Sequence, residues 1–92
     1  MSSGARTVVL YTRPACGLCD EAARELARLA PLLALRIERK DVTSDASLFE
    51  RYGMAIPVVE LDGREVARAP LRPGVLEAKL RDAIRDTSPA PR

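Results

Sequence analysis

Apolar and polar positions follow two different periods along the chain, and together they predict its elements of secondary structure. A run of β-branched and aliphatic residues over 7–11 is typical of a strand buried on both faces. Over residues 18–30 apolar positions recur every three or four residues, which predicts a helix with Leu18 on its buried face and its end at Pro31. Alternation over residues 33–38 predicts a half-buried strand, whose many charges suit the edge of a sheet.

The second half of the chain predicts a short helix, a strand that begins with a proline, a returning strand and a last helix. These elements are expected at residues 46–52, 56–61, 65–68 and 75–85. The short helix is expected to bury Phe49 and Tyr52, with Gly53 as its C-terminal cap. Asp62 and Gly63 form the pair that most strongly indicates a two-residue hairpin turn.

This order, β-α-β-α-β-β-α, indicates an α/β fold. The first two strands are joined by a helix, so we expect them to be parallel with a right-handed crossover, while the last two form a hairpin. The expected result is a four-stranded mixed sheet flanked by three helices. A chain of 92 residues holds one core, which we place at residues 7–85, between a flexible N-terminus at 1–6 and a disordered tail at 86–92.

The charge and composition of the chain narrow the classes of function. Fifteen basic and 13 acidic residues leave a net charge of +2, without a basic block and with three aromatic residues in all. Nucleic-acid binding is therefore not expected. No apolar run has the length of a signal peptide core or a membrane span, so we expect a cytoplasmic protein that makes no membrane contact and is a monomer.

The chemistry of the chain is concentrated in its two cysteines, Cys16 and Cys19, which lie between the first strand and the first helix. Only a thiolate attacks a disulfide. At the helix N-terminus the Cys16 thiolate would be stabilised by free N–H groups and by the helix dipole, with Arg13 just upstream and Gly17 giving close access to the backbone. Cys19 lies one turn on and is expected to be deeper. Cys16 would attack a substrate disulfide, and Cys19 would then displace the reduced product.

Two other interpretations of the cysteine pair remain open on spacing alone. The two residues can pack as small apolar side chains. They can also contribute half of a metal or cluster site, which normally needs four protein ligands. The chain has no histidine and no third cysteine, so such a binding module would form at a dimer interface, and no metal ligand set is assigned within one chain. An inactive adaptor that keeps the fold is a further alternative.

The run VVLYTRPACGLCDEAARELARL, followed by FERYGMAIPVVELDGREV, resembles the thioredoxin superfamily. More narrowly it resembles the small glutaredoxin-like proteins, over residues 7–85. The resemblance implies a thioredoxin-like fold and a thiol–disulfide oxidoreductase of cell redox homeostasis with a redox-active disulfide between Cys16 and Cys19. It also implies that the Ile56–Pro57 peptide bond is cis, lies against the sulfurs and pairs with an extended thiol substrate through its backbone.

The same resemblance frames the expectations for ligands and partners. Classical glutaredoxins have Pro-Tyr between the cysteines, and a Gly-Gly turn with an Asp that hold glutathione. This chain has Gly-Leu and a different loop at residues 68–74, where Arg72 is the candidate partner for a substrate carboxylate. The strand before the motif also lacks the buried acid of thioredoxins. We expect no tightly bound cofactor, glutathione as a possible co-substrate, and partners that are disulfide-containing proteins or low-molecular-weight thiols. Glutathione or a reductase would supply the electrons.

Overall fold

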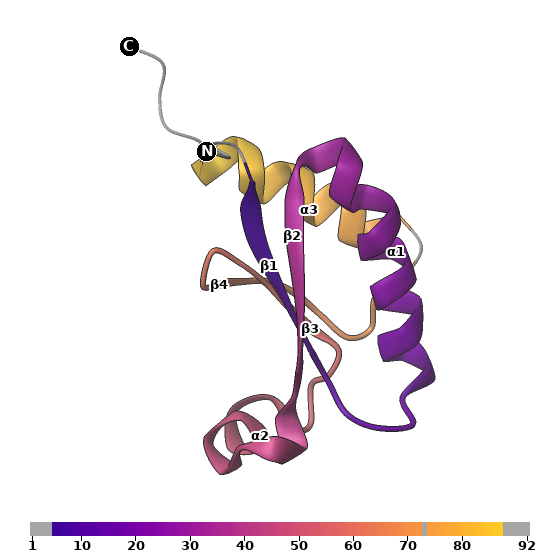
Figure 1. Cartoon of the computed structure of the whole chain (residues 1–92), viewed down its shortest axis with the longest axis vertical. Helices are drawn as coiled ribbons and strands as arrows, with labels where there is room; N and C mark the ends of the chain where they lie inside the picture. The colour runs from indigo at the N-terminus through magenta and orange to yellow at the C-terminus, as the bar shows by residue number, and fades with distance from the viewer. Residues whose placement is uncertain (1–4, 73, 88–92) are drawn as a thin grey trace.

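A four-stranded sheet forms the centre of the fold in the computed structural model, which describes residues 5–72 and 74–87 (Figure 1). The strands are β1 (Arg6–Thr12), β2 (Leu35–Asp41), β3 (Val58–Leu61) and β4 (Arg64–Arg68). The helices are α1 (Gly17–Leu33), α2 (Ala46–Tyr52) and α3 (Val75–Thr87), with a 3₁₀ turn η1 (Val42–Ser44) before α2. The expected order of elements and the thioredoxin-like α/β fold are therefore confirmed.

The pairing of the strands is mixed, as expected. The sheet order is β2-β1-β3-β4, with β1 parallel to β2 and antiparallel to β3, and β3 antiparallel to β4. β1 is thus an inner strand, and its residues from Val8 to Thr12 are buried. Asp62 and Gly63 join β3 to β4 with φ of 49° and 87°, the left-handed conformations that a tight hairpin of this twist requires.

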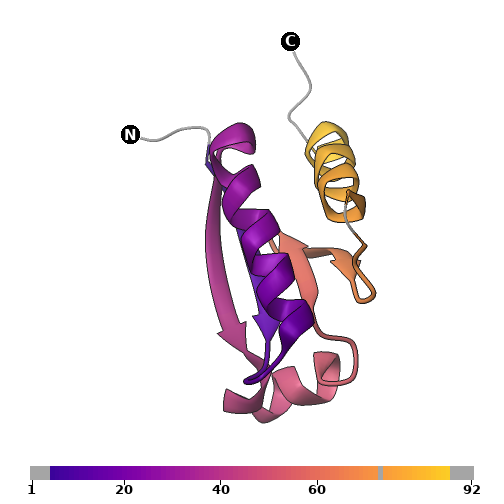
Figure 2. The same ribbon diagram turned by 90° about the vertical axis from the view of Figure 1, so that its right-hand side faces the viewer.

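Helices cover the two faces of the sheet unequally (Figure 2). On one face α1 and α3 pack against alternate residues of β1 and β3. The buried residues of this larger core are Val8, Leu10, Ala22, Leu26, Leu29, Val59, Leu61, Ala67, Leu76 and Leu80. On the other face a smaller cluster packs beside α2, and it consists of Val9, Tyr11, Val42, Tyr52 and Val58. Because α2 begins just after β2 ends, it lies at the same end of the sheet as the start of α1.

The prediction that Pro31 ends the first helix is wrong. α1 continues through Pro31 to Leu33, so β2 begins at Leu35, two residues later than predicted. Pro31 lies in the last turn, where its missing N–H removes one hydrogen bond without interrupting a long run, and Leu33 still packs against the core. The helix ends instead at Ala34, whose φ of 57° turns the chain while its N–H donates to the Ala30 carbonyl.

Two apolar side chains that the pattern placed in the core are exposed. Leu18 is 53% exposed because the stripe of α1 that faces the sheet begins one residue later, at Cys19. Phe49 is 49% exposed and lies against Gly53, where an added Cβ would stand 2.5 Å from the Phe49 carbonyl oxygen and 2.9 Å from its ring. Gly53 caps α2 as predicted, but with φ of −56°, so the position needs the small residue for close approach rather than for a left-handed turn.

The predicted boundaries at the two ends of the chain shift slightly. Arg6 belongs to β1, and Asp86 and Thr87 belong to α3, so the ordered elements extend into both predicted tails. Ala5 is exposed, and residues 1–4 and 88–92 lie outside the described residues. Across 5–72 and 74–87, none of the helices combines the length and the apolar character needed to cross a membrane.

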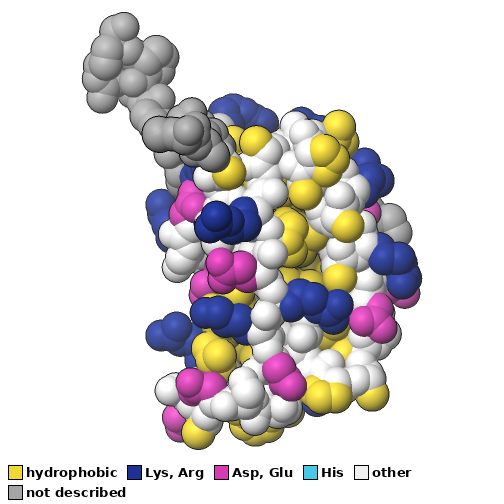
Figure 3. All heavy atoms as spheres, in the orientation of Figure 1, with side chains coloured by type: hydrophobic (Ala, Val, Ile, Leu, Met, Phe, Trp, Pro, Cys, Tyr) yellow, Lys and Arg dark blue, Asp and Glu magenta, His cyan; other side chains and the backbone are white. Residues whose placement is uncertain are grey.

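β2 forms one edge of the sheet, as its charges predicted. Its exposed side chains are Arg36, Glu38, Arg39 and Lys40. Basic and acidic side chains are interspersed over the face that Figure 3 shows, rather than gathered by sign. Charges along an edge strand discourage pairing with a second chain.

Candidate functional site

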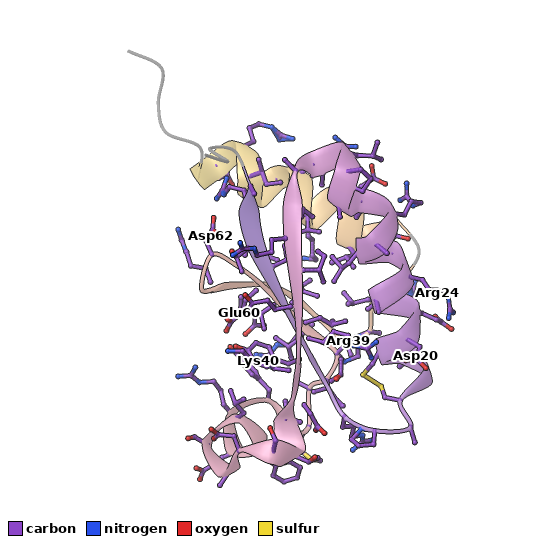
Figure 4. The ribbon with its side chains drawn as sticks, viewed as in Figure 1. Asp20, Arg24, Arg39, Lys40, Glu60 and Asp62 are labelled. Carbon is purple, nitrogen blue, oxygen red and sulfur yellow. A yellow bond between two sulfur atoms is a disulfide. The ribbon has the colours of Figure 1, made fainter. Side chains whose placement is uncertain are left out.

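The two cysteines lie at the N-terminus of α1, where the loop after β1 enters the helix (Figure 4). Cys16 is the N-cap residue in extended conformation, and the preceding Ala15 has φ of 58°. Cys16 and Cys19 form a disulfide with 5.2 Å between their Cα atoms. The Sγ of Cys16 also accepts a hydrogen bond of 3.1 Å from the Cys19 N–H, so a sulfur occupies the place of a capping oxygen.

The two sulfurs differ in their access to solvent. Cys16 is partly exposed, whereas Cys19 is fully buried. The difference follows from the helix, because Cys19 begins the buried stripe that continues through Ala22 and Leu26. The expectation that Cys19 is the deeper of the two is confirmed, and an external disulfide can reach Cys16 more readily than Cys19.

The charged side chains near the start of α1 are exposed. Asp20 pairs with Arg39 of β2 at 3.5 Å (Figure 4). Glu21 is exposed as well. Arg13 is also exposed, and among the described residues it makes no ion pair or hydrogen bond, so its influence on Cys16 stays a prediction.

Pro57 lies where the resemblance requires it, at the head of β3. The Ile56–Pro57 peptide bond is cis, as implied. Val58 is opposite Tyr11 in the sheet, so Pro57 is next to the end of β1, from which the loop to Cys16 departs. Pro57 is fully buried, and its carbonyl accepts a hydrogen bond of 2.9 Å from the Ala69 N–H. That this segment binds substrate stays a prediction.

Arg72 lies in the loop between β4 and α3 and is exposed. It lines a cavity of about 90 Å³ together with Glu21 and Glu25 of α1. A substrate carboxylate that entered this cavity would meet one guanidinium and two acids. The structure therefore places Arg72 beside the motif helix but in a mixed electrostatic setting, and its role as a carboxylate partner stays a prediction.

A buried acid that sequence reasoning missed lies on the opposite face of the sheet from α1. Glu60 is 8% exposed, and its carboxylate accepts hydrogen bonds from the Tyr11 hydroxyl at 3.0 Å and the Tyr52 hydroxyl at 2.7 Å. The two rings are 4.7 Å apart. Burial, and then the bond to Glu60, raise the pKa of Tyr11 to about 12, and the same causes raise the pKa of Tyr52. The signal was present in the sequence, because Glu60 interrupts an otherwise apolar strand at Val58–Leu61.

The chemistry that this arrangement supports is that of a dithiol and its disulfide. In the part of the chain that the structure describes, there is no group of three or more His, Cys, Asp or Glu side chains that could hold a metal ion. One sulfur is accessible at a helix N-terminus and its partner is buried within bonding distance. This geometry permits exchange with an external disulfide and closure of the internal one.

Comparison with known proteins gives a family and a fold. The profile of the family described as Glutaredoxin-like domain (DUF836) matches residues 7–85. An uncharacterised protein of Mycobacterium tuberculosis is 38% identical over 63 residues, 63% of this chain, and the match spans 65% of that relative's length. A structural genomics target protein from X. campestris shares 33% identity, with a TM-score of 0.67, over 82% of this chain and 96% of its own.

Thioredoxins share the fold at lower sequence identity. Thioredoxin 1 from Thermosipho africanus TCF52B aligns over 90% of this chain and 99% of its own with a TM-score of 0.62 and 17% identity. At this identity the likeness concerns the fold alone. The family match and the disulfide together support a redox role in general.

Proposed function

Because the chain belongs to the glutaredoxin-like (DUF836) family, we propose that it is a thiol–disulfide oxidoreductase that uses Cys16 and Cys19. The observation that carries the proposal is the asymmetry of the pair. Cys16 caps α1 with its Sγ at a backbone N–H and is partly exposed, while Cys19 is fully buried beside it. An anion at this cap would be stabilised by the same N–H and by the helix dipole, so Cys16 is the attacking thiolate.

The catalytic cycle consists of two exchanges. The Cys16 thiolate attacks one sulfur of a substrate disulfide, which forms a mixed disulfide and releases the other substrate sulfur as a thiolate. Cys19 then loses its proton and attacks Cys16 Sγ, which forms the internal disulfide and releases the second substrate thiolate. The substrate gains two electrons and the protein loses two. The released thiolates take up protons from solvent.

Regeneration requires two electrons from a thiol donor. Two molecules of glutathione, or the dithiol of a reductase, would reduce the internal disulfide by the reverse exchanges. The substrate would be a disulfide-containing protein or a low-molecular-weight disulfide. A reducing compartment such as the cytoplasm suits this cycle, and the cycle would serve cell redox homeostasis.

Substrate contacts are assigned around the exposed sulfur. The backbone at Ile56 and Pro57 would pair with an extended segment of the substrate, because these residues directly precede β3 beside the end of β1. Arg13, which is free of described partners, would contact a substrate carboxylate or the developing thiolate. Arg72 would contribute a second positive charge from the loop beside α1.

Alkylation of the reduced protein tests the assignment of the attacking thiolate. We expect iodoacetamide at pH 6.5 to modify Cys16 faster than free cysteine and much faster than Cys19, as measured by mass spectrometry of timed samples. The Cys19→Ser variant should keep this reactivity and accumulate a mixed disulfide with substrate, and Cys16→Ser should show neither. A Cys16 that reacts no faster than free cysteine would refute the proposal.

A second assay identifies the electron donor. Oxidised protein is mixed either with glutathione or with a thioredoxin-reductase system, and the loss of the Cys16–Cys19 disulfide is followed by thiol labelling. If the mixed environment around Arg72 disfavours glutathione, the reductase system should act faster. Failure of both donors to reduce the disulfide would argue against a catalytic cycle.

A further inference from the structure

Glu60 connects three elements of the fold through two hydrogen bonds. It lies on β3, and its two carboxylate oxygens accept from Tyr11 of β1 at 3.0 Å and from Tyr52 at the end of α2 at 2.7 Å. All three residues are at least nine-tenths buried. Burying a carboxylate costs free energy unless the carboxylate accepts hydrogen bonds. The two phenols and the acid are therefore held in one relative arrangement.

These bonds enclose the segment that carries Pro57. The hydrogen bond between Tyr52 and Glu60 joins the two ends of the connection between α2 and β3, and residues 53–59 lie between the two partners. The hydrogen bond from Tyr11 attaches Glu60 to β1, at a position five residues before Cys16. On its other side the segment is held by the hydrogen bond from Ala69 to the Pro57 carbonyl.

The cluster cannot act on the sulfurs directly. Along β3, Val59 and Leu61 point into the core that contains α1, while Val58 belongs to the cluster beside α2. Glu60 therefore faces away from α1 and the disulfide, as Figure 4 shows. Any influence of the cluster on the redox pair therefore has to pass through the position of the backbone.

A role in stability alone does not explain why position 60 carries a carboxylate. An apolar residue at position 60 would complete a strand in which Val58, Val59 and Leu61 are all buried. Replacing every partner of a buried hydrogen-bond network by apolar groups is often neutral or stabilising, whereas replacing Glu60 alone would leave the two phenols without their acceptor. Hydrogen bonds, unlike apolar contacts, fix direction and distance, and here they fix the segment at residues 53–59 relative to the strand that leads to Cys16.

We propose that Glu60 is a positioning residue. Together with Tyr11 and Tyr52 it holds the Ile56–Pro57 backbone in the position from which this backbone pairs with a disulfide substrate beside Cys16. The inference rests on the proposed function. It assigns the cluster to substrate affinity and not to the reactivity of the sulfur. Loss of the bonds therefore raises KM for a protein disulfide and leaves alkylation of Cys16 unchanged.

Three variants test the inference. Tyr52→Phe removes one donor, and we expect KM for a protein disulfide to rise about tenfold, which corresponds to about 1.4 kcal/mol and is of the size of one hydrogen bond to a charged group. Glu60→Gln should remain within about twofold of the wild type, because an amide can accept from one phenol and donate to the other. The triple variant Tyr11→Phe/Tyr52→Phe/Glu60→Leu removes every polar group, so it should stay folded while KM stays high.

The results separate positioning from stability and from the proposed function itself. The inference is overturned if KM changes only in variants that have lost thermal stability. In that case a triple variant as stable as the wild type would have the KM of the wild type. An altered pH profile of Cys16 alkylation in Tyr52→Phe also overturns it. Amide hydrogen exchange provides a readout that needs no activity: exchange at residues 53–56 should accelerate in Tyr52→Phe and not in Glu60→Gln. If the wild type itself reduces no disulfide, the proposed function fails while this exchange result still decides whether the cluster holds the segment.

Discussion

The two tyrosines offer a direct physical test of the buried cluster. The chain has two tyrosines and no tryptophan, so the ultraviolet absorbance of tyrosinate reports on Tyr11 and Tyr52 alone. Burial and the carboxylate of Glu60 raise the pKa of Tyr11 from 10.0 to about 12, and they raise the pKa of Tyr52 in the same direction. The positive charge of Arg51 acts against both shifts but does not reverse them.

The shift also predicts how stability depends on pH. A phenol is neutral when protonated, so a raised pKa in the folded protein means that the unfolded chain loses the proton first. Stability due to Tyr11 is therefore fully present below pH 10 and is lost as pH rises toward about 12. A shift of about two units corresponds to about 2.7 kcal/mol for Tyr11 alone, since one unit is 1.36 kcal/mol. That is a large part of the stability expected for a small domain.

The assay is an absorbance titration of native protein beside protein in concentrated urea. We expect the denatured sample to titrate near pH 10 and the native sample to show little tyrosinate until it unfolds. Tyr52→Phe leaves Tyr11 as the sole chromophore, and Tyr11→Phe provides the converse sample. Titration of Tyr11 near pH 10 in protein that is still folded by circular dichroism would refute the description of the cluster.

Three other substitutions test features of the fold by urea unfolding. Pro31→Ala should raise the free energy of unfolding by about 1–2 kcal/mol, because it restores a helical N–H and removes an exposed side chain that makes few contacts. A lower free energy of unfolding would contradict this prediction. Gly53→Ala should lower it by about 1–3 kcal/mol, because the new Cβ meets the carbonyl oxygen of Phe49; an unchanged midpoint would show that the backbone yields. The Arg6 guanidinium, and then the Thr7 N–H, lower the pKa of Asp62, so the stability that Asp62 contributes should be lost as pH falls below 4. Asp62→Asn should therefore show a smaller difference in stability between pH 6 and pH 3 than the wild type.

The order and type of elements were predictable because the apolar periods are long and the turn residues are specific. Asp62-Gly63 fixed the hairpin, and the helical period of residues 18–30 fixed α1. The end of α1 was not predictable from Pro31, because a proline in the last turn removes a single hydrogen bond while Leu33 still gains burial. At this helix end the packing of Leu33 outweighs the local tendency of proline to end a helix.

For the candidate site, the sequence indicated the cysteines and Pro57 but not what lies behind them. Spacing and the preceding strand were enough to place Cys16 at the N-terminus of a helix and Cys19 deeper, and the structure makes Cys16 the N-cap residue. Glu60 escaped notice because a charged residue in a strand is ordinarily assigned to the solvent side. The strand pattern marks Glu60 as an interruption, but its burial depends on phenols from two other elements, which the pattern along one strand does not show.

The distribution of aromatic residues has a consequence for how this domain folds. Tyr11, Phe49 and Tyr52 are its only aromatic residues. Both tyrosines lie in the layer beside α2, and Phe49 is on α2 itself, whereas the layer with α1 and α3 is aliphatic. In the reduced protein, which lacks the disulfide chromophore, near-ultraviolet dichroism therefore reports on the α2 layer, while the far-ultraviolet signal is dominated by the two long helices opposite it. Melting curves recorded at the two wavelengths measure whether the layers unfold together, and coincident curves would mean that the whole domain is one cooperative unit.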